Sequence, residues 1–229
     1  MSKMLLHELH PSVVHAPLAL LSTATVADLI ALSTGDRAWE RVGRRFWVAG
    51  ALSALFAGVA GLAASQQVRM REPHARDMAF LHGAGNTLIT LGAVGVALWR
   101  QANRPSAAQC ALAAGAVGAA LYTATLGGKM VYELGVGINA MPADQAQGTL
   151  KGPALLSPEA PAALVRDAAA GVRWLLGRVR TLASGAQPLA RGAEGVREPD
   201  SSAVILGPSD TGAQPSARSP EGYPGLGLS

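Results

Sequence analysis

The sequence predicts an all-α integral membrane protein: an antiparallel four-helix bundle followed by a mostly disordered C-terminal tail that contains one amphipathic helix. Three observations lead to this fold class. The 229 residues are 49% hydrophobic but only 15% charged, whereas about 25% of the residues in an ordinary soluble domain are charged. The apolar residues gather in four stretches, each close to the ~20 residues that cross a bilayer. Ten of the fourteen prolines lie between residues 142 and 224.

These patterns divide the chain into a four-span membrane domain over residues 1–140 and a Pro/Gly-rich tail over residues 141–229. The spans are expected at residues 13–32, 46–64, 80–99 and 107–126. The connecting loops are expected at residues 33–45, 65–78 and 100–106. Such short connections force neighbouring helices to run up, down, up and down.

Small residues recur at four-residue spacing within two of the spans. The second span carries Gly50, Ala54 and Gly58, and the fourth carries the stripe 111–119 with Ala, Gly and Ala at every fourth position. Lipid tails provide no hydrophobic drive for helix pairing, so helices in a bilayer associate by close backbone approach. Both rows are therefore predicted to be packing faces.

One segment of the tail has a helical pattern. Over residues 162–183, leucine, valine and alanine recur at helical spacing and arginines flank the stripe. A basic amphipathic helix of this kind is typical of the membrane interface, held there by its apolar face and by anionic lipid. The alternative is a surface helix that docks on a partner protein.

The antiparallel topology places all five histidines on one side of the membrane. His15 and His82 are each the third residue of their spans, so they are expected at equal depth on two helices of one bundle. This is the geometry that a pair of axial haem ligands needs. Asn86 and Thr90 continue a polar stripe from His82, which predicts that this face of the third span points inward. Asn86 is also a candidate to hydrogen-bond an axial imidazole.

Four further polar residues have predicted roles. His10, which precedes a proline, is expected to cap the start of the first helix. Tyr132 and Glu133 follow the fourth span and return to the histidine side, where they are candidates to hydrogen-bond an imidazole. Asp28, near the opposite end of the first span, is expected to pair with an arginine of the first loop such as Arg37.

Two motifs flank these spans. Residues 10–21 read HPSVVHAPLALL and residues 127–137 read GGKMVYELGVG, with Asp28 and His82 between them. In these motifs and in the number and order of its spans, the chain resembles, over about residues 5–140, the bacterial predicted-membrane-protein family filed as domain of unknown function 2231. Leu134 stands where that family often has a histidine. The family has no established activity, so the resemblance implies a four-span architecture and a multi-pass protein of a bacterial inner (cytoplasmic) membrane.

Three functional hypotheses follow from the residues. The first is a haem-b protein in which His15 and His82 are axial ligands and electrons pass to or from a quinone or a membrane redox partner. The second is an accessory or scaffold subunit without a cofactor, in which the histidines are polar packing elements. The third is a divalent-metal or proton-linked site formed by His10, His15, His82 and Glu133 at one membrane face. A homo-oligomer is compatible with each.

Several other classes are excluded. The single cysteine, Cys110, excludes an internal disulfide, an iron–sulfur cluster with thiolate ligands and a thiolate zinc cage. No phosphate-binding loop, nucleophile elbow or paired carboxylates occur within the spans, so no catalytic residue is assigned and enzyme activity is not expected. The basic residues are not interleaved with aromatic ones, which argues against nucleic-acid binding.

Overall fold

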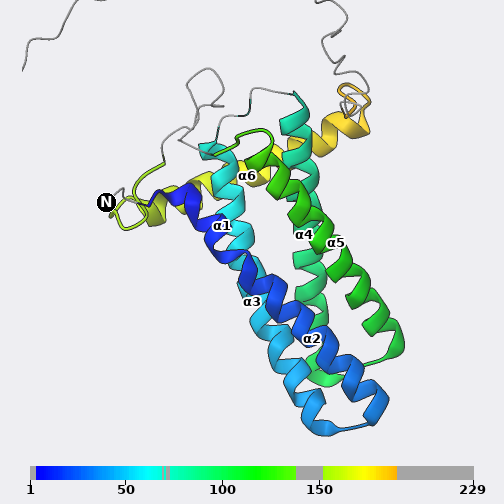
Figure 1. Ribbon diagram of the computed structural model, residues 1–229. Helices are drawn as coiled ribbons and strands as arrows, with labels where there is room; N and C mark the ends of the chain where they lie inside the picture. Colours follow the sequence, from blue (N-terminus) through cyan, green and yellow to red (C-terminus); the bar gives the residue numbers. More distant parts are fainter. Residues whose placement is uncertain (1–3, 69, 71–72, 138–151, 190–229) are drawn as a thin grey trace, which may run out of the picture. The chain divides into compact units, whose positions relative to one another are not determined.

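The computed structural model describes residues 4–68, 70, 73–137 and 152–189, which form helices and contain no strand (Figure 1). All of them belong to one compact unit, Met1–Gly192, and the second unit, Ala193–Ser229, lies outside the described residues. Most of the tail predicted to be disordered also lies outside them. The elements are η1 (Leu6–Glu8), α1 (Leu9–Val13), α2 (His15–Thr34), α3 (Arg37–Gln67), α4 (Pro73–Ala102), α5 (Ala107–Tyr132) and α6 (Ala160–Ala183). The predicted all-α class is confirmed.

Four helical segments are long and apolar enough to cross a membrane. They are Leu6–Thr34, which comprises η1, α1 and α2, followed by α3, α4 and α5. In the bundle, α2 contacts α3 and α5, and α4 contacts the same two helices, so the four helices surround a common centre. With 26 to 31 residues each, at ~1.5 Å per residue, they extend beyond a ~30 Å hydrocarbon layer.

The bundle has small residues inside and large apolar residues outside. Its buried cluster is built around Leu21 and Trp47 and is otherwise entirely alanine: Ala24, Ala51, Ala54, Ala93, Ala97 and Ala113. Large aliphatic side chains point outward, and Leu88, Leu98 and Leu112 are 71%, 69% and 75% exposed. A soluble protein would bury these leucines, whereas lipid solvates them. The packing therefore agrees with a membrane protein.

The first connection is much shorter than the predicted loop over residues 33–45. Only Gly35 and Asp36 lie between α2 and α3. Gly35 adopts φ 70°, a left-handed conformation that suits glycine at a helix end. Asp36 then caps α3, because its carboxylate accepts the Ala38 N–H at 2.7 Å. The arginines expected in a loop are consequently carried on the first turns of α3.

The first span is broken near its start, because α1 ends at Val13 and α2 begins at His15. Pro17 lacks an N–H, and its ring conflicts with the carbonyl four residues earlier, that of Val13. The helical start also lies upstream of His10, since the Glu8 carboxylate accepts the Leu5 N–H at 2.8 Å. The prediction that His10 caps the first helix is therefore wrong.

The two predicted packing faces differ in outcome. Gly50 lies against α2, where an added Cβ would come within 2.6 Å of the Leu21 side chain. On α5, Ala111, Gly115 and Ala119 are exposed, and nothing lies within 4 Å of a Cβ added to Gly115. The buried face of α5 instead includes Cys110 and Ala113. The small-residue stripe of α5 is thus turned away from the bundle.

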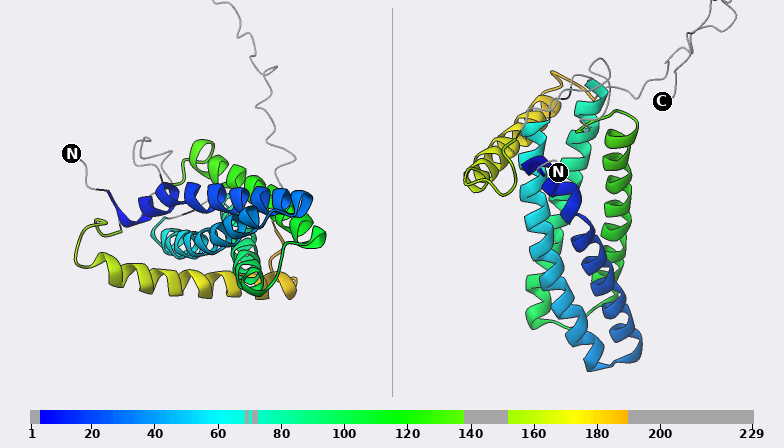
Figure 2. Two further views of the ribbon diagram at one scale, coloured as in Figure 1. Left: turned by 90° about the horizontal axis from the view of Figure 1, so that it is seen from below. Right: turned by 60° about the vertical axis from the view of Figure 1, so that its left-hand side comes forward.

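Helix α6 packs against the bundle at the end opposite the α2–α3 turn (Figures 1 and 2). Gly171 permits this approach: a Cβ there would lie 2.5 Å from the Leu62 carbonyl oxygen of α3. Trp174 meets Phe80 of α4 edge to face, with ring centroids 6.4 Å apart. The helix expected over residues 162–183 is therefore present, and one of its faces docks on the chain's own bundle.

Two polar contacts fix α6 further. The Gln67 amide donates to Asp167 at 2.8 Å, and Arg178 donates to Asp77 at 2.6 Å. Burial of Asp167 opposes its charged form, but hydrogen bonds from Arg166 and Gln67 and the charge of Arg166 outweigh this, so the pKa of Asp167 lies below its ordinary value. Of these hydrogen bonds, only the one from Gln67 joins α6 to the bundle, because Arg166 lies on α6 itself.

Candidate functional site

The histidine that faces His82 is His10. Their ring centroids lie 6.0 Å apart with the ring planes at 85°. His10 belongs to α1 in the first span and His82 to α4 in the third, so two different spans supply the pair. Both side chains are only partly accessible.

Each ring is held by a backbone carbonyl of a neighbouring span. Nδ1 of His10 lies 3.0 Å from the Ala57 carbonyl oxygen of α3, and Nδ1 of His82 lies 2.8 Å from the Thr123 carbonyl oxygen of α5. A carbonyl oxygen only accepts, so both Nδ1 atoms carry the proton. In a neutral ring, the lone pair then resides on Nε2.

Asn86 and Thr123 lie beside His82 and form hydrogen bonds with it and with each other. The Asn86 amide donates to the His82 backbone carbonyl at 2.8 Å and lies 3.4 Å from the ring Nδ1. The Thr123 hydroxyl donates to the Asn86 Oδ1 at 3.1 Å. The sequence interpretation included Asn86 but missed Thr123. The sequence did contain a signal for Thr123: it is a polar residue within an apolar span, and only a position that faces the other helices offers it hydrogen-bond partners.

Glycines provide the room that the two rings occupy. A Cβ added to Gly61 would lie 2.9 Å from both Nδ1 and Cε1 of His10, and one added to Gly127 would lie 3.1 Å from Cε1 of His82. Real Cβ atoms essentially never approach to 2.9 Å. The absence of a side chain at Gly61 and Gly127 thus leaves the space in which the two imidazole rings lie.

The other predicted site residues are not brought to this pair. His15, Tyr132 and Glu133 are exposed, and Tyr132 is 83% exposed. Throughout the described part of the chain, no three His, Cys, Asp or Glu side chains are arranged to hold a metal ion. The residues gathered are therefore His10, His82, Asn86 and Thr123, whereas His15 lies apart on the outer face of α2.

A second polar centre, at the opposite end of the bundle, is an ion pair. Asp28 is fully buried and Arg100 is 2% exposed. Arg100 donates from Nε and Nη2 to the two carboxylate oxygens at 3.0 and 2.9 Å, and Trp47 donates to the same carboxylate at 2.8 Å. Asp28 therefore pairs with an arginine of α4, and the expectation that it pairs with Arg37 is wrong.

This ion pair can form only because the backbone of α3 at Gly43 lies close to the Asp28 carboxylate. A Cβ added to Gly43 would lie 2.1 Å from Asp28 Oδ1, so glycine alone leaves space for the carboxylate. Arg100 is also bonded to the Asn103 and Glu40 carbonyls. Arg100 is thus turned into the bundle although it stands at the end of an apolar span, where a basic side chain commonly reaches out to the membrane interface.

Comparison with known proteins agrees with this architecture. The model of a family described as a predicted membrane protein, DUF2231, matches residues 6–140. No curated protein sequence and no solved structure is significantly similar to the chain. The match covers more than half of the chain and includes all four spans and both histidines of the pair. The chain therefore belongs to the DUF2231 family of predicted membrane proteins.

Proposed function

We propose that this protein is a membrane electron-transfer component that holds haem b between His10 and His82. The observation that carries the proposal is the pair itself: two imidazoles from different spans face each other, and each Nδ1 is bonded to a backbone carbonyl. Metal-bound histidines characteristically donate their second ring N–H to such a group, which fixes the tautomer and the ring orientation. The proposed location is the inner membrane of a bacterium.

The donor set fits haem iron. Both Nε2 atoms carry the lone pair that an axial ligand offers, and neutral imidazole is a common haem ligand. His10 and His82, whose ring centroids lie 6.0 Å apart, would hold the iron through these nitrogen atoms. His10 takes the place that the sequence interpretation gave to His15, which is exposed.

The chain's own residues hold and orient the ligands. The Ala57 and Thr123 carbonyls fix the two imidazoles, and Gly61 and Gly127 leave room for them. The two rings are partly buried between apolar helices. Bound haem would supply one-electron chemistry, and the proposed exchange partner is a quinone or another redox protein of the same membrane.

The visible spectrum tests this function. The full chain, expressed with a haem precursor and purified in mild detergent, is expected to show a Soret band and sharp reduced α and β bands. His10→Ala and His82→Ala should each abolish the bands. His15→Ala and His74→Ala are matched controls, because both side chains are exposed and lie on the same two spans. Both controls should retain the spectrum.

Two results would contradict the proposal. If His15→Ala removes the bands and His10→Ala does not, the axial pair is His15 and His82. If every preparation is colourless although helix content and monodispersity are normal, haem is not the ligand. The second candidate function would then stand.

That second candidate is an accessory or scaffold subunit without a cofactor. It is favoured by the same carbonyl hydrogen bonds, because they satisfy one polar atom of each histidine without any ligand. It is also favoured by the exposed small-residue stripe of α5, a face suited to another helix. Cross-linking of the native membrane through cysteines placed at Gly115 would recover a defined partner or a second copy if this function is correct.

We also propose that α6 lies in the membrane interface. Its outer face carries apolar side chains, with Val165, Val172 and Leu176 69%, 43% and 55% exposed, beside exposed arginines. A bimane label at Val172, in a Cys110→Ser background, should be quenched by brominated lipid in vesicles. A label that brominated lipid leaves unquenched would contradict an interfacial position.

A further inference from the structure

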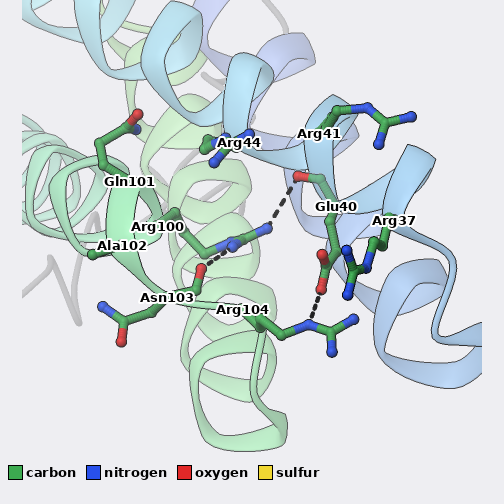
Figure 3. Close-up of a pocket in the computed structure, with 9 residues that line it drawn as sticks. All are labelled: Arg37, Glu40, Arg41, Arg44, Arg100, Gln101, Ala102, Asn103 and Arg104. Atoms are coloured by element: carbon green, nitrogen blue, oxygen red, sulfur yellow. Dashed lines mark hydrogen bonds and ion pairs between the residues drawn. The ribbon is translucent and has the colours of Figure 1, made fainter.

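An arginine-rich pocket opens at the end of the bundle opposite the histidine pair, where α3 begins and α4 ends (Figure 3). Its volume is about 270 Å³. Five of its nine lining residues are arginines: Arg37, Arg41, Arg44, Arg100 and Arg104. The one acidic lining residue is Glu40.

The charges in this pocket do not balance. Arg100 is neutralised by the buried Asp28, and Arg104 pairs with Glu40. The remaining three arginines have no ionic partner among the residues that the structure describes: Arg37, Arg41 and Arg44. Their spacing of four and three residues puts them on one face of α3, where like charges repel one another. An anion at this face would relieve that repulsion.

An apolar groove adjoins the arginine pocket. It has a volume of about 360 Å³ and shares Arg44 and Gln101 with the pocket. From there it follows α3 along Val48, Ala49 and Leu52. Leu52 lies eight positions beyond Arg44 on the same helix, a rise of about 12 Å toward the hydrocarbon layer. A polar pocket is therefore continuous with an apolar groove that points into the membrane.

We propose that these two cavities form one binding site for an anionic phospholipid. The phosphate would bind the guanidinium groups, which match phosphate oxygens in geometry and charge. The acyl chain would lie in the groove against Val48 and Leu52. A free phosphate satisfies only the polar half of this site, whereas a zwitterionic lipid does not supply the net negative charge. The proposal is independent of what His10 and His82 bind.

Lipid binding can be measured on the intact chain by native mass spectrometry from detergent, with phosphatidylglycerol and phosphatidylcholine as probes. Phosphatidylglycerol should bind more tightly than phosphatidylcholine. Arg41→Gln/Arg44→Gln should weaken phosphatidylglycerol binding by about tenfold or more. The matched control is Arg76→Gln/Lys129→Gln, which removes two exposed cations of α4 and α5 and the same net charge. That control should change binding by less than about threefold.

A groove variant distinguishes the lipid from its phosphate alone. Ala49→Phe fills the groove, and Ala119→Phe makes the same change at an exposed position of α5. Only Ala49→Phe should weaken phosphatidylglycerol binding, and millimolar inorganic phosphate should not displace the lipid. Circular dichroism should show that each variant retains its helices.

Three results would overturn the proposal. Equal loss of binding in Arg41→Gln/Arg44→Gln and in Arg76→Gln/Lys129→Gln would mean that the lipid responds to net charge and has no specific site. Unchanged binding in Arg41→Gln/Arg44→Gln would exclude the arginine pocket. Displacement by inorganic phosphate, with no effect of Ala49→Phe, would assign the pocket to a free phosphate group instead of a lipid.

Discussion

The buried pair between Asp28 and Arg100 leads to a quantitative prediction about stability. Asp28→Asn preserves the shape of the side chain but removes its charge and places an amide N–H₂ within reach of the Arg100 donors. Arg100, 2% exposed, then keeps the amide oxygen and two backbone carbonyls as acceptors but has no negatively charged partner. The variant therefore leaves a cation inside the bundle without its counter-ion.

The magnitude follows from the burial of the pair and its hydrogen bonds. Breaking a buried ion pair by removing one partner costs about 3–5 kcal/mol, and here two of the three hydrogen bonds to the carboxylate come from Arg100. Asp28→Asn and Arg100→Gln should each lower the free energy of unfolding by about this amount. The double variant removes both charges, so its loss should be smaller than the sum by about 2–3 kcal/mol.

Unfolding in mixed micelles, with the SDS fraction increased and helix content followed by circular dichroism, provides the free energies for this cycle. Arg104→Gln is the control, because Arg104 pairs with Glu40 at the same end of the bundle but is 64% exposed. Such an exposed pair is worth about 0–1 kcal/mol. If Asp28→Asn costs no more than Arg104→Gln, or if the two single losses simply add, the pair does not stabilise the bundle as reasoned.

Three further predictions concern Gly43, Gly171 and Asp167. Gly43→Ala places a methyl group against the buried carboxylate and should lower the free energy of unfolding by about 1–3 kcal/mol. Gly58→Ala on the same helix is the control: its methyl group meets nothing within 4 Å, so it should be neutral or stabilising by up to about 1 kcal/mol. Gly171→Ala should loosen α6 and speed tryptic cleavage within it, and Gly177→Ala, also free of contacts within 4 Å, should not; equal cleavage rates would contradict the docking geometry. Because the pKa of Asp167 is lowered in the folded chain, its charged form stabilises that chain, and this contribution is complete above an ordinary aspartate pKa of about 3.9 and disappears as pH falls through the lowered value. Protection of the α6 amides, taken relative to the intrinsic exchange rate at each pH, should therefore fall below about pH 4, and Asp167→Asn should remove that pH dependence; an unchanged profile in the variant would be inconsistent with this role.

Much of the fold was predictable because hydropathy depends only on local composition. The four spans, their antiparallel order and the helix in the tail all follow from apolar runs and helical spacing. The exact residues at which the helices begin and end could not be predicted from hydropathy. Arg37 begins α3 although it is charged, because a helix continues past the hydrocarbon layer wherever a cap such as Asp36 starts it early.

The sequence by itself determined that this is a four-span membrane protein with its histidines toward one end, since length and polarity decide which segments a bilayer accepts. It also indicated that His82 and Asn86 face inward, because a polar stripe in an apolar helix needs partners. Only the tertiary structure decided that His10 rather than His15 meets His82. The break near Pro17 interrupts the helix between these two histidines, so the rotation of one cannot be extrapolated to the other.

The same limit applies to Asp28, which pairs with Arg100 across 72 positions of sequence. The sequence shows that both residues are charged and lie near a membrane boundary, but it does not show which residue pairs with which. The pairing depends on how closely three helices approach, and that approach is permitted by the absence of a side chain at Gly43. Helix rotation and interhelical distance arise from all contacts together, which is why the partner became evident only in the folded bundle.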